Sequence, residues 1–155
     1  MKSIYLLKED FKNFPIGEFP YDKNHSAMGE YHFVQYPGYY GKWYDPVCNY
    51  RYNGQGASWV ITEYCGKHYM EQMRLHNTEP HRTFPTLETG DRFWENYDIE
   101  ASVRMFNTKW GNAGIGFCAQ NSLNMLVFMF EDKQVKLVYR HKENVEELES
   151  KAFDY

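Results

Sequence analysis

Side chains able to do chemistry are concentrated in residues 67–77, where basic and amide groups recur at alternate positions. Successive side chains of a β-strand point to opposite faces, so one face of this segment would gather His68, Met70, Gln72, Arg74 and His76. Arginine can bind a carboxylate through two hydrogen bonds, and glutamine and histidine can hydrogen-bond hydroxyl groups. The segment therefore predicts a strand face able to hold a sugar or a uronate, although an ordinary solvated strand face has the same pattern.

The four tryptophans are the second group of candidates, because an indole face can stack on the apolar C–H surface of a pyranose ring. Trp59 lies within a strand pattern and is predicted to be a core residue. Trp43 and Trp110 each lie close to glycines in segments predicted to be loops, which makes them the preferred platforms, with Asn112 close to Trp110. The aromatic loop of residues 36–44 would equally serve as a cover over one end of the core.

Metal ligands and cysteines are not grouped in the sequence. His76 and His81 flank a turn that contains Pro80, and no third ligand accompanies them, so a metal-dependent reaction is not predicted. The three cysteines form no C-x-x-C pair, which indicates reduced thiols rather than a disulfide framework or a zinc site. A structural Ca²⁺ held by Asp10 or Asp154 is compatible with the sequence, because oxygen-only sites leave little sequence signature. No other cofactor is implied.

Composition and charge exclude several kinds of partner. The 17 basic and 21 acidic residues give a net charge of −4 without a basic cluster, so a nucleic-acid partner is not predicted. No apolar stretch reaches the roughly 18 residues needed to cross a bilayer, and no signal-peptide pattern is visible. We therefore expect a soluble, cytoplasmic protein with no membrane partner. The length of 155 residues predicts one domain, residues 1–155.

The second half of the chain predicts several strands to position these candidates. The clearest alternation of apolar and polar side chains spans residues 97–105. Three further strands are expected at residues 113–120, 123–130 and 134–141. The last two would form a hairpin through Asp132 and Lys133. Residues 123–130 are apolar on both faces, which predicts a central strand covered on both sides.

The first half predicts shorter strands separated by proline and glycine. These strands are expected at residues 31–36, 58–64 and 67–75. Cys65 and Gly66 are the predicted turn between the last two strands. Residues 11–29 contain prolines and glycines with little periodicity, and their aromatic content predicts an ordered loop.

Residues 142–151 are the one segment with helix-like charge content, and Val145 and Leu148 give it a single apolar edge. About nine short strands with turn signals between them otherwise account for the chain. This spacing indicates an all-β protein, an antiparallel β-sandwich, and we favour a jelly roll among the sandwich types.

Four segments resemble, in order and pattern, the concanavalin A-like lectin/glucanase superfamily, including its LamG-like jelly-roll domains: residues 97–104, 111–117, 124–130 and 135–140. In such domains a strand of the type y-x-[IVL]-E-A-x-V-R precedes an A-G-[IV]-x-F strand, a polar turn and a hairpin. The resemblance covers Asp10, Phe11 and residues 94–140. It implies a curved two-sheet jelly roll whose concave face commonly holds sugar, often attached to polysaccharide-degrading enzymes. Such domains continue with further strands, whereas this chain ends at Tyr155, so a sandwich incomplete at its C-terminus is expected, as a module or fragment of a longer protein.

The same resemblance bears on catalysis. Asn96, Asp98 and Glu100 stand where the β-glucanase branch has an E-x-D-x-E strand that supplies the nucleophile and the acid/base. Retaining glycosidases need two carboxyl groups about 5 Å apart, and the first position here is an amide. No catalytic residue is therefore predicted. A lyase would instead need a group that neutralises a uronate and a base, and residues 67–77 contain both types.

These observations predict a non-catalytic, lectin-like module that binds an oligo- or polysaccharide and is associated with polysaccharide processing. Its predicted ligand-binding residues are Trp43, His68, Gln72, Arg74, His76, Trp110 and Asn112. Two alternatives stay open: a glycoside hydrolase or polysaccharide lyase domain, and a structural domain that packs on a catalytic partner. A second copy of the chain, in a homo-oligomer, is the other expected partner.

Overall fold

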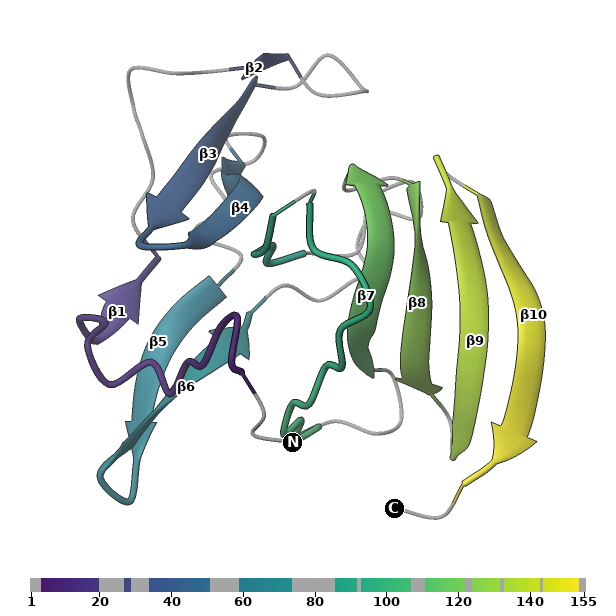
Figure 1. Cartoon of the computed structure of the whole chain (residues 1–155). Helices are drawn as coiled ribbons and strands as arrows, with labels where there is room; N and C mark the ends of the chain where they lie inside the picture. The colour runs from purple at the N-terminus through teal and green to yellow at the C-terminus, as the bar shows by residue number, and fades with distance from the viewer. Residues whose placement is uncertain are drawn as a thin grey trace. The chain divides into compact units, whose positions relative to one another are not determined.

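The computed structural model describes residues 4–19, 27–28, 34–50, 59–73, 86–91, 93–106, 111–121, 124–131, 133–142 and 144–153. Every regular element within these residues is a β-strand, and every strand pair is antiparallel (Figure 1). The strands form three sheets, in the orders β1-β5-β6, β2-β3-β4 and β10-β9-β8-β7. No helix long and apolar enough to span a membrane is found in this part of the chain. The predicted all-β, antiparallel class is confirmed.

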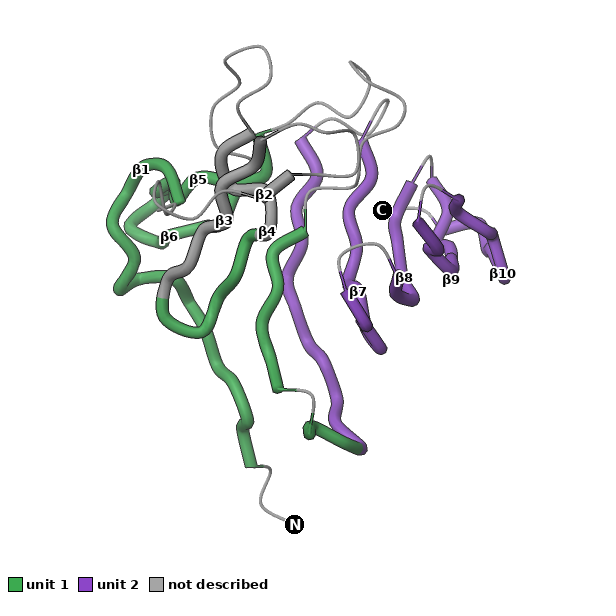
Figure 2. The backbone as a smooth tube through the Cα atoms, turned by 90° about the horizontal axis from the view of Figure 1, so that it is seen from above, with its two compact units in different colours: residues 1–74, 85–95 green, residues 75–84, 96–155 purple. Residues whose placement is uncertain are grey.

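The chain divides into two compact units, coloured separately in Figure 2. Unit 1 consists of Met1–Arg74 and Pro85–Glu95, and unit 2 consists of Leu75–Phe84 and Asn96–Tyr155. The sheets β1-β5-β6 and β2-β3-β4 belong to unit 1, and the sheet β10-β9-β8-β7 belongs to unit 2.

A tight hairpin organises the first sheet of unit 1. Strands β5 (Trp59–Tyr64) and β6 (Lys67–Gln72) pair antiparallel, and β1 (Gly17–Glu18) adds to the other edge of β5. The φ angles of Cys65 and Gly66 are 52° and 71°. Two positive φ angles in a two-residue loop match the right-handed twist of the flanking strands, so the predicted turn is confirmed.

The core of unit 1 is built largely from a segment predicted to be a loop. Its buried side chains are Phe14, Phe19 and Ile61. Partly buried side chains packed against them are Phe11, Trp43, Trp59, Met70 and Leu87. The amide of Phe19 donates to the carbonyl of Trp59 over 3.1 Å, which ties the loop to β5. Trp59, predicted to be a core residue, is partly buried and packs against this core.

The second sheet of unit 1 corrects the prediction of an aromatic loop at residues 36–44. Strands β3 (Val34–Tyr40) and β4 (Trp43–Tyr50) form a hairpin, and β2 (Ala27–Met28) pairs with β3. Pro37 lies at a register shift in β3, where its missing N–H is tolerated, and Gly41 lies in the turn with φ 59°. Residues that signal a loop in the sequence therefore mark a bulge and a turn, and Trp43 begins a strand.

Unit 2 contains a four-stranded meander. Its strands are β7 (Asn112–Asn121), β8 (Asn124–Glu131), β9 (Gln134–His141) and β10 (Asn144–Ala152). Each strand pairs with the next in sequence, so the three strands predicted at residues 113–120, 123–130 and 134–141 and the hairpin through Lys133 are confirmed. The φ angle of Lys133 is 58°, as a tight hairpin turn requires.

Strand β10 shows that the helix-like interpretation of residues 142–151 is wrong. The register shifts between Glu147 and Glu149, so Leu148 is the extra residue of a bulge. Val145 and Leu148, three positions apart, therefore form no helical stripe. The backbone hydrogen bonds available along β9 outweigh the local helix preference of glutamate and lysine.

Burial in the unit 2 sheet is one-sided. Met125 and Met129 of β8 and Val138 and Arg140 of β9 are buried, and their cross-strand pairing places them on one face. Phe128 on the opposite face is 44% exposed. The central position of β8 is as predicted, whereas the prediction that β8 is covered on both sides is wrong for Phe128.

The segment with the clearest alternation in the sequence is not a strand. Residues 97–105 carry no strand assignment, and most of their side chains are exposed. Alternation makes a segment suitable for one face of a sheet, but a strand exists only where a second backbone completes its hydrogen bonds. The predicted strand at residues 97–105 is therefore corrected to an extended, exposed segment.

Candidate functional site

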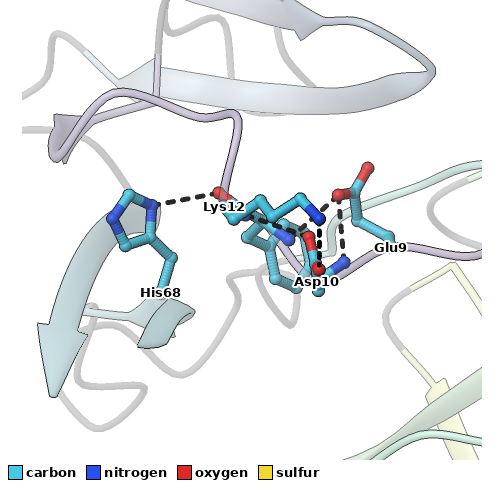
Figure 3. Close-up of polar contacts among 5 residues, drawn as sticks. Glu9, Asp10, Lys12 and His68 are labelled. Carbon is cyan, nitrogen blue, oxygen red and sulfur yellow. Dashed lines mark hydrogen bonds and ion pairs between the residues drawn. The ribbon is translucent and has the colours of Figure 1, made fainter. Parts of the chain in front are cut away.

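Two of the predicted site residues, Trp43 and His68, contact the same short segment of unit 1. This segment, residues 9–12, precedes the core residue Phe14 and carries two carboxylates and an ammonium group. Trp43 comes from β4 and His68 from β6, which belong to different sheets. The 9–12 segment thus joins side chains that lie far apart in sequence. Figure 3 shows its contact with His68.

The 9–12 segment is held in a turn by its own side chains. The Oε1 atom of Glu9 accepts hydrogen bonds from the amides of Asp10 and Phe11, at 3.1 and 2.9 Å. Asp10 Oδ1 accepts from the amide of Lys12 at 3.2 Å, and the carbonyl of Phe11 accepts from the amide of Phe14 at 2.9 Å. Phe11 has a φ angle of 57°. Short acidic side chains that bond nearby amides are typical of such turns.

The Trp43 ring is fixed on two sides. Its Nε1–H group donates to Glu9 Oε2 over 3.3 Å. The Phe11 ring lies 5.5 Å from the Trp43 ring, tilted by 44°. Trp43 also packs against the unit 1 core and stays partly exposed. It therefore combines a fixed orientation with an accessible aromatic surface.

The environment of His68 defines its tautomer. The Nδ1 atom lies 3.1 Å from the carbonyl oxygen of Phe11, and a carbonyl oxygen can only accept, so Nδ1 carries the proton. In the neutral ring Nε2 is then an acceptor. Nε2 lies 3.9 Å from Glu63 Oε2, and the side chain of His68 is 19% exposed. In its neutral form His68 can thus accept a hydrogen bond from a hydroxyl group, whereas in its protonated form Nε2 would pair with Glu63.

Charge near the 9–12 segment is mainly negative. The backbone hydrogen bond from Lys12 is the largest cause that lowers the pKa of Asp10, and the Lys12 ammonium group, 3.4 Å from Asp10 Oδ2, acts in the same direction. Asp10 is therefore ionised at neutral pH. Together with Glu9 and Glu63 it offers acceptor oxygens, which suit ligands rich in hydroxyl donors.

The other predicted residues are distributed differently. Gln72 is exposed at the end of β6, on the same face as His68 and Met70. Met70 pairs with the buried Ile61 and packs on the core, so the middle of this face is covered. Asn112 belongs to unit 2, where its Nδ2 donates to Glu131 Oε1 over 3.3 Å. Arg74, His76 and Trp110 lie outside the described residues.

The potential metal ligands and thiols of the described residues do not form a site. No group of three or more His, Cys, Asp or Glu side chains suited to a metal ion occurs among the described residues, and Asp154 lies outside them. Cys65 and Cys118 are free, exposed thiols. Asp98 and Glu100 are both exposed in the segment that follows Asn96.

Sequence reasoning missed Glu9 and Phe11 as parts of this site. Each contacts a predicted residue across a long sequence separation, 34 positions for Glu9 with Trp43 and 57 for Phe11 with His68. The only available signal was the combination of acidic and aromatic residues just before a proline-containing loop.

Comparison with known proteins returns no relative: no protein-family model, curated protein or solved structure matches the chain.

Proposed function

We propose that the protein is a carbohydrate-binding, lectin-like module associated with polysaccharide processing, whose glycan binds beside the 9–12 segment. The observation that carries this proposal is that Trp43 and His68, from different sheets, are both fixed by residues 9–12. Sugar recognition needs an aromatic surface for C–H groups and several fixed acceptors for hydroxyl groups, and this cluster contains both kinds.

The chemistry assigns a role to each group. The partly exposed Trp43 ring offers its surface to the apolar face of a pyranose. His68 Nε2 and the carboxylates of Glu9 and Glu63 accept hydrogen bonds from hydroxyl groups. Glu9 already holds the Trp43 ring and the turn amides, so acceptor and platform are positioned before the ligand arrives.

Calorimetric titration against a panel of oligosaccharides, chosen after a glycan-array screen, tests this proposal. Loss of one neutral hydrogen bond costs about 0.5–1.5 kcal/mol, so His68→Ala is expected to weaken binding about 2- to 10-fold. Trp43→Phe keeps an aromatic ring on the core and removes the Nε1–H group, and a loss of affinity is expected as well. Arg74→Ala is the third variant, nominated by the sequence pattern alone.

Tyr69→Ala is the matched control, because Tyr69 is exposed on the opposite face of β6. Its affinity should equal that of the unchanged protein, and circular dichroism should show that all variants are folded. Absence of affinity for every glycan in the panel, or equal affinity in all variants, would contradict the proposal.

The same samples separate binding from turnover. A binding module returns the oligosaccharide unchanged. New reducing ends, or an unsaturated uronate product absorbing in the ultraviolet, would instead favour the hydrolase or lyase alternative.

The proposed fold of this module is a concanavalin A-like jelly roll. One-sided burial in the antiparallel β10-β9-β8-β7 sheet supports the two-layer part of this proposal, because a sheet with one buried face needs a second layer. An experimentally determined structure with two sheets packed face to face is the expected result, and an open arrangement would contradict it.

A further inference from the structure

Residues 98–106 of unit 2 have the side-chain pattern of a strand without a strand partner. Within the described part of the chain, no backbone hydrogen bond joins them to another residue. Three of their apolar side chains are strongly exposed: Ile99 at 48%, Val103 at 46% and Phe106 at 74%. No residue of the segment has a positive φ angle. An exposed backbone of this kind is a template for pairing with another chain.

Two of the three charged residues of the segment are placed symmetrically. Asp98 and Arg104 lie three positions before and three positions after Ala101, and both are exposed. The Arg104 guanidinium group lies 4.7 Å from the centre of the Phe106 ring, and within the described residues it makes no ion pair. Asp98 likewise makes no ion pair within this part of the chain.

We propose that residues 97–105 pair antiparallel with the same residues of a second copy of the chain, about a two-fold axis at Ala101. In this register Asp98 faces the partner's Arg104, and symmetry repeats this pair at the other end. Ile99 faces the partner's Val103. The inference concerns assembly and does not depend on the proposed glycan site.

The alternation of the segment selects this register. A two-fold axis that passes between two neighbouring residues of the segment, rather than through one residue, would place polar side chains opposite apolar side chains of the partner. An axis at Glu100 would place the two Glu100 carboxylates opposite each other, and like charges directly opposite are destabilising. An axis at Ser102 would pair Glu100 with the partner's Arg104 but would place Asp98 opposite the partner's Phe106, so its matched pairs extend over seven positions only. The axis at Ala101 alone matches apolar with apolar and acid with base over nine positions.

Sedimentation equilibrium over a concentration series, combined with charge reversal, tests the proposal. The unchanged chain should associate reversibly to a dimer. Asp98→Arg alone, or Arg104→Asp alone, turns two attractive pairs into repulsive ones, which is expected to weaken dimerisation about tenfold. The double variant Asp98→Arg with Arg104→Asp restores opposite charges and should restore the dimer. A monomer at all concentrations, or single variants that dimerise as well as the unchanged chain, would overturn the proposal.

Cysteine crosslinking gives a second test that does not depend on affinity. Ala101→Cys places two cysteines directly across the pair, with their Cα atoms about 4.5–5.5 Å apart, which is within the roughly 4.4–6.8 Å that a disulfide spans, so oxidation should link two chains covalently. Glu100→Cys is the matched control, because its thiol faces the partner's Ser102 and the two thiols lie farther apart. Equal crosslinking of both variants and of the unchanged chain, which carries Cys48, Cys65 and Cys118, would contradict the register.

Discussion

Strand β10 and residues 97–105 of unit 2 show opposite relations between sequence pattern and structure. Residues 97–105 alternate apolar and polar side chains without interruption, yet they form no strand. Strand β10 carries three glutamates and a helix-like charge pattern, yet it pairs with β9 along eight positions. Its carboxylate Glu147 also bonds Lys136 of β9 over 3.4 Å.

The difference lies in the neighbouring backbone. β10 follows β9 after a short turn, so its amides find carbonyl partners at a small cost in loop-closure entropy. Residues 98–105 have no hydrogen-bonded strand partner among the described residues, so their pattern alone does not form a strand. Sheet formation in this chain is therefore decided by the available partner more than by the pattern of the single segment.

The largest expected loss of stability comes from a valine-to-alanine change in β9. The same change within residues 98–106, which form no strand, is the comparison. Val138→Ala removes apolar atoms from a side chain that is 2% exposed, which should lower the free energy of unfolding by about 2 kcal/mol. Val103→Ala, at a concentration where the chain is monomeric, should change it by less than about 0.5 kcal/mol. Chemical denaturation measures both. A large loss for Val103→Ala would show that residues 97–105 are packed within the chain.

An effect of comparable size is expected at the contact between β7 and β8. A Cβ atom on Gly114 would meet the carbonyl oxygen of Phe128 and lie 2.9 Å from Cα of Met129. Backbone atoms cannot move away cheaply, so Gly114→Ala should destabilise the fold by about 1–3 kcal/mol. Ala101→Gly is the control in the unpaired segment and should be nearly neutral. A neutral Gly114→Ala in thermal melts would contradict the close approach of β7 and β8.

The two halves of the chain also show which parts of the fold the residue pattern could predict. The hairpins at Cys65-Gly66 and Lys133 follow from turn chemistry between short strands, and both were predicted. The burial of Phe14 and Phe19 was not predicted, because a segment with prolines and glycines has no periodicity to indicate a core face. Strand β4 was missed for a related reason, since Pro37 and Gly41 suggest a loop where the structure has a bulge and a turn.

The candidate site was predictable only in part. Trp43 and His68 were selected by residue type, and the structure brings both to residues 9–12. The role of Glu9 could not be predicted, since no local pattern indicates which carboxylate meets an indole 34 positions away. The predicted polar face of β6 is interrupted by Met70, because a period of two specifies which side chains share a face but not which face is buried.

The smallest expected effect is electrostatic and concerns the attachment of β10. A hydrogen bond from Ser150 and the nearby Lys136 lower the pKa of Glu147 below 4.5. The ionised Glu147 carboxylate therefore stabilises the fold above pH 4.5, and this stabilisation is lost as the pH falls through the lowered pKa. Hydrogen bonds and charge from Glu131 and Glu147 raise the pKa of Lys136 above 10.5. The contribution of Lys136 is complete below pH 10.5 and is lost as the pH rises through the raised pKa.

Melting temperatures across the pH range should therefore decline at both ends. Lys136→Met should flatten both declines, and Lys151→Met, an exposed position of β10, should leave them unchanged. Identical pH profiles for Lys136→Met and the unchanged protein would show that these ion pairs do not stabilise β10.

Amide hydrogen exchange, resolved by residue on the monomeric protein, tests most directly whether partner backbone decides strand formation here. Alternate amides of β10 should be protected by their bonds to β9, and residues 98–106 should exchange at nearly the rate of an unstructured chain. Protection of residues 98–106 in the monomer, or unprotected amides throughout β10, would contradict this account.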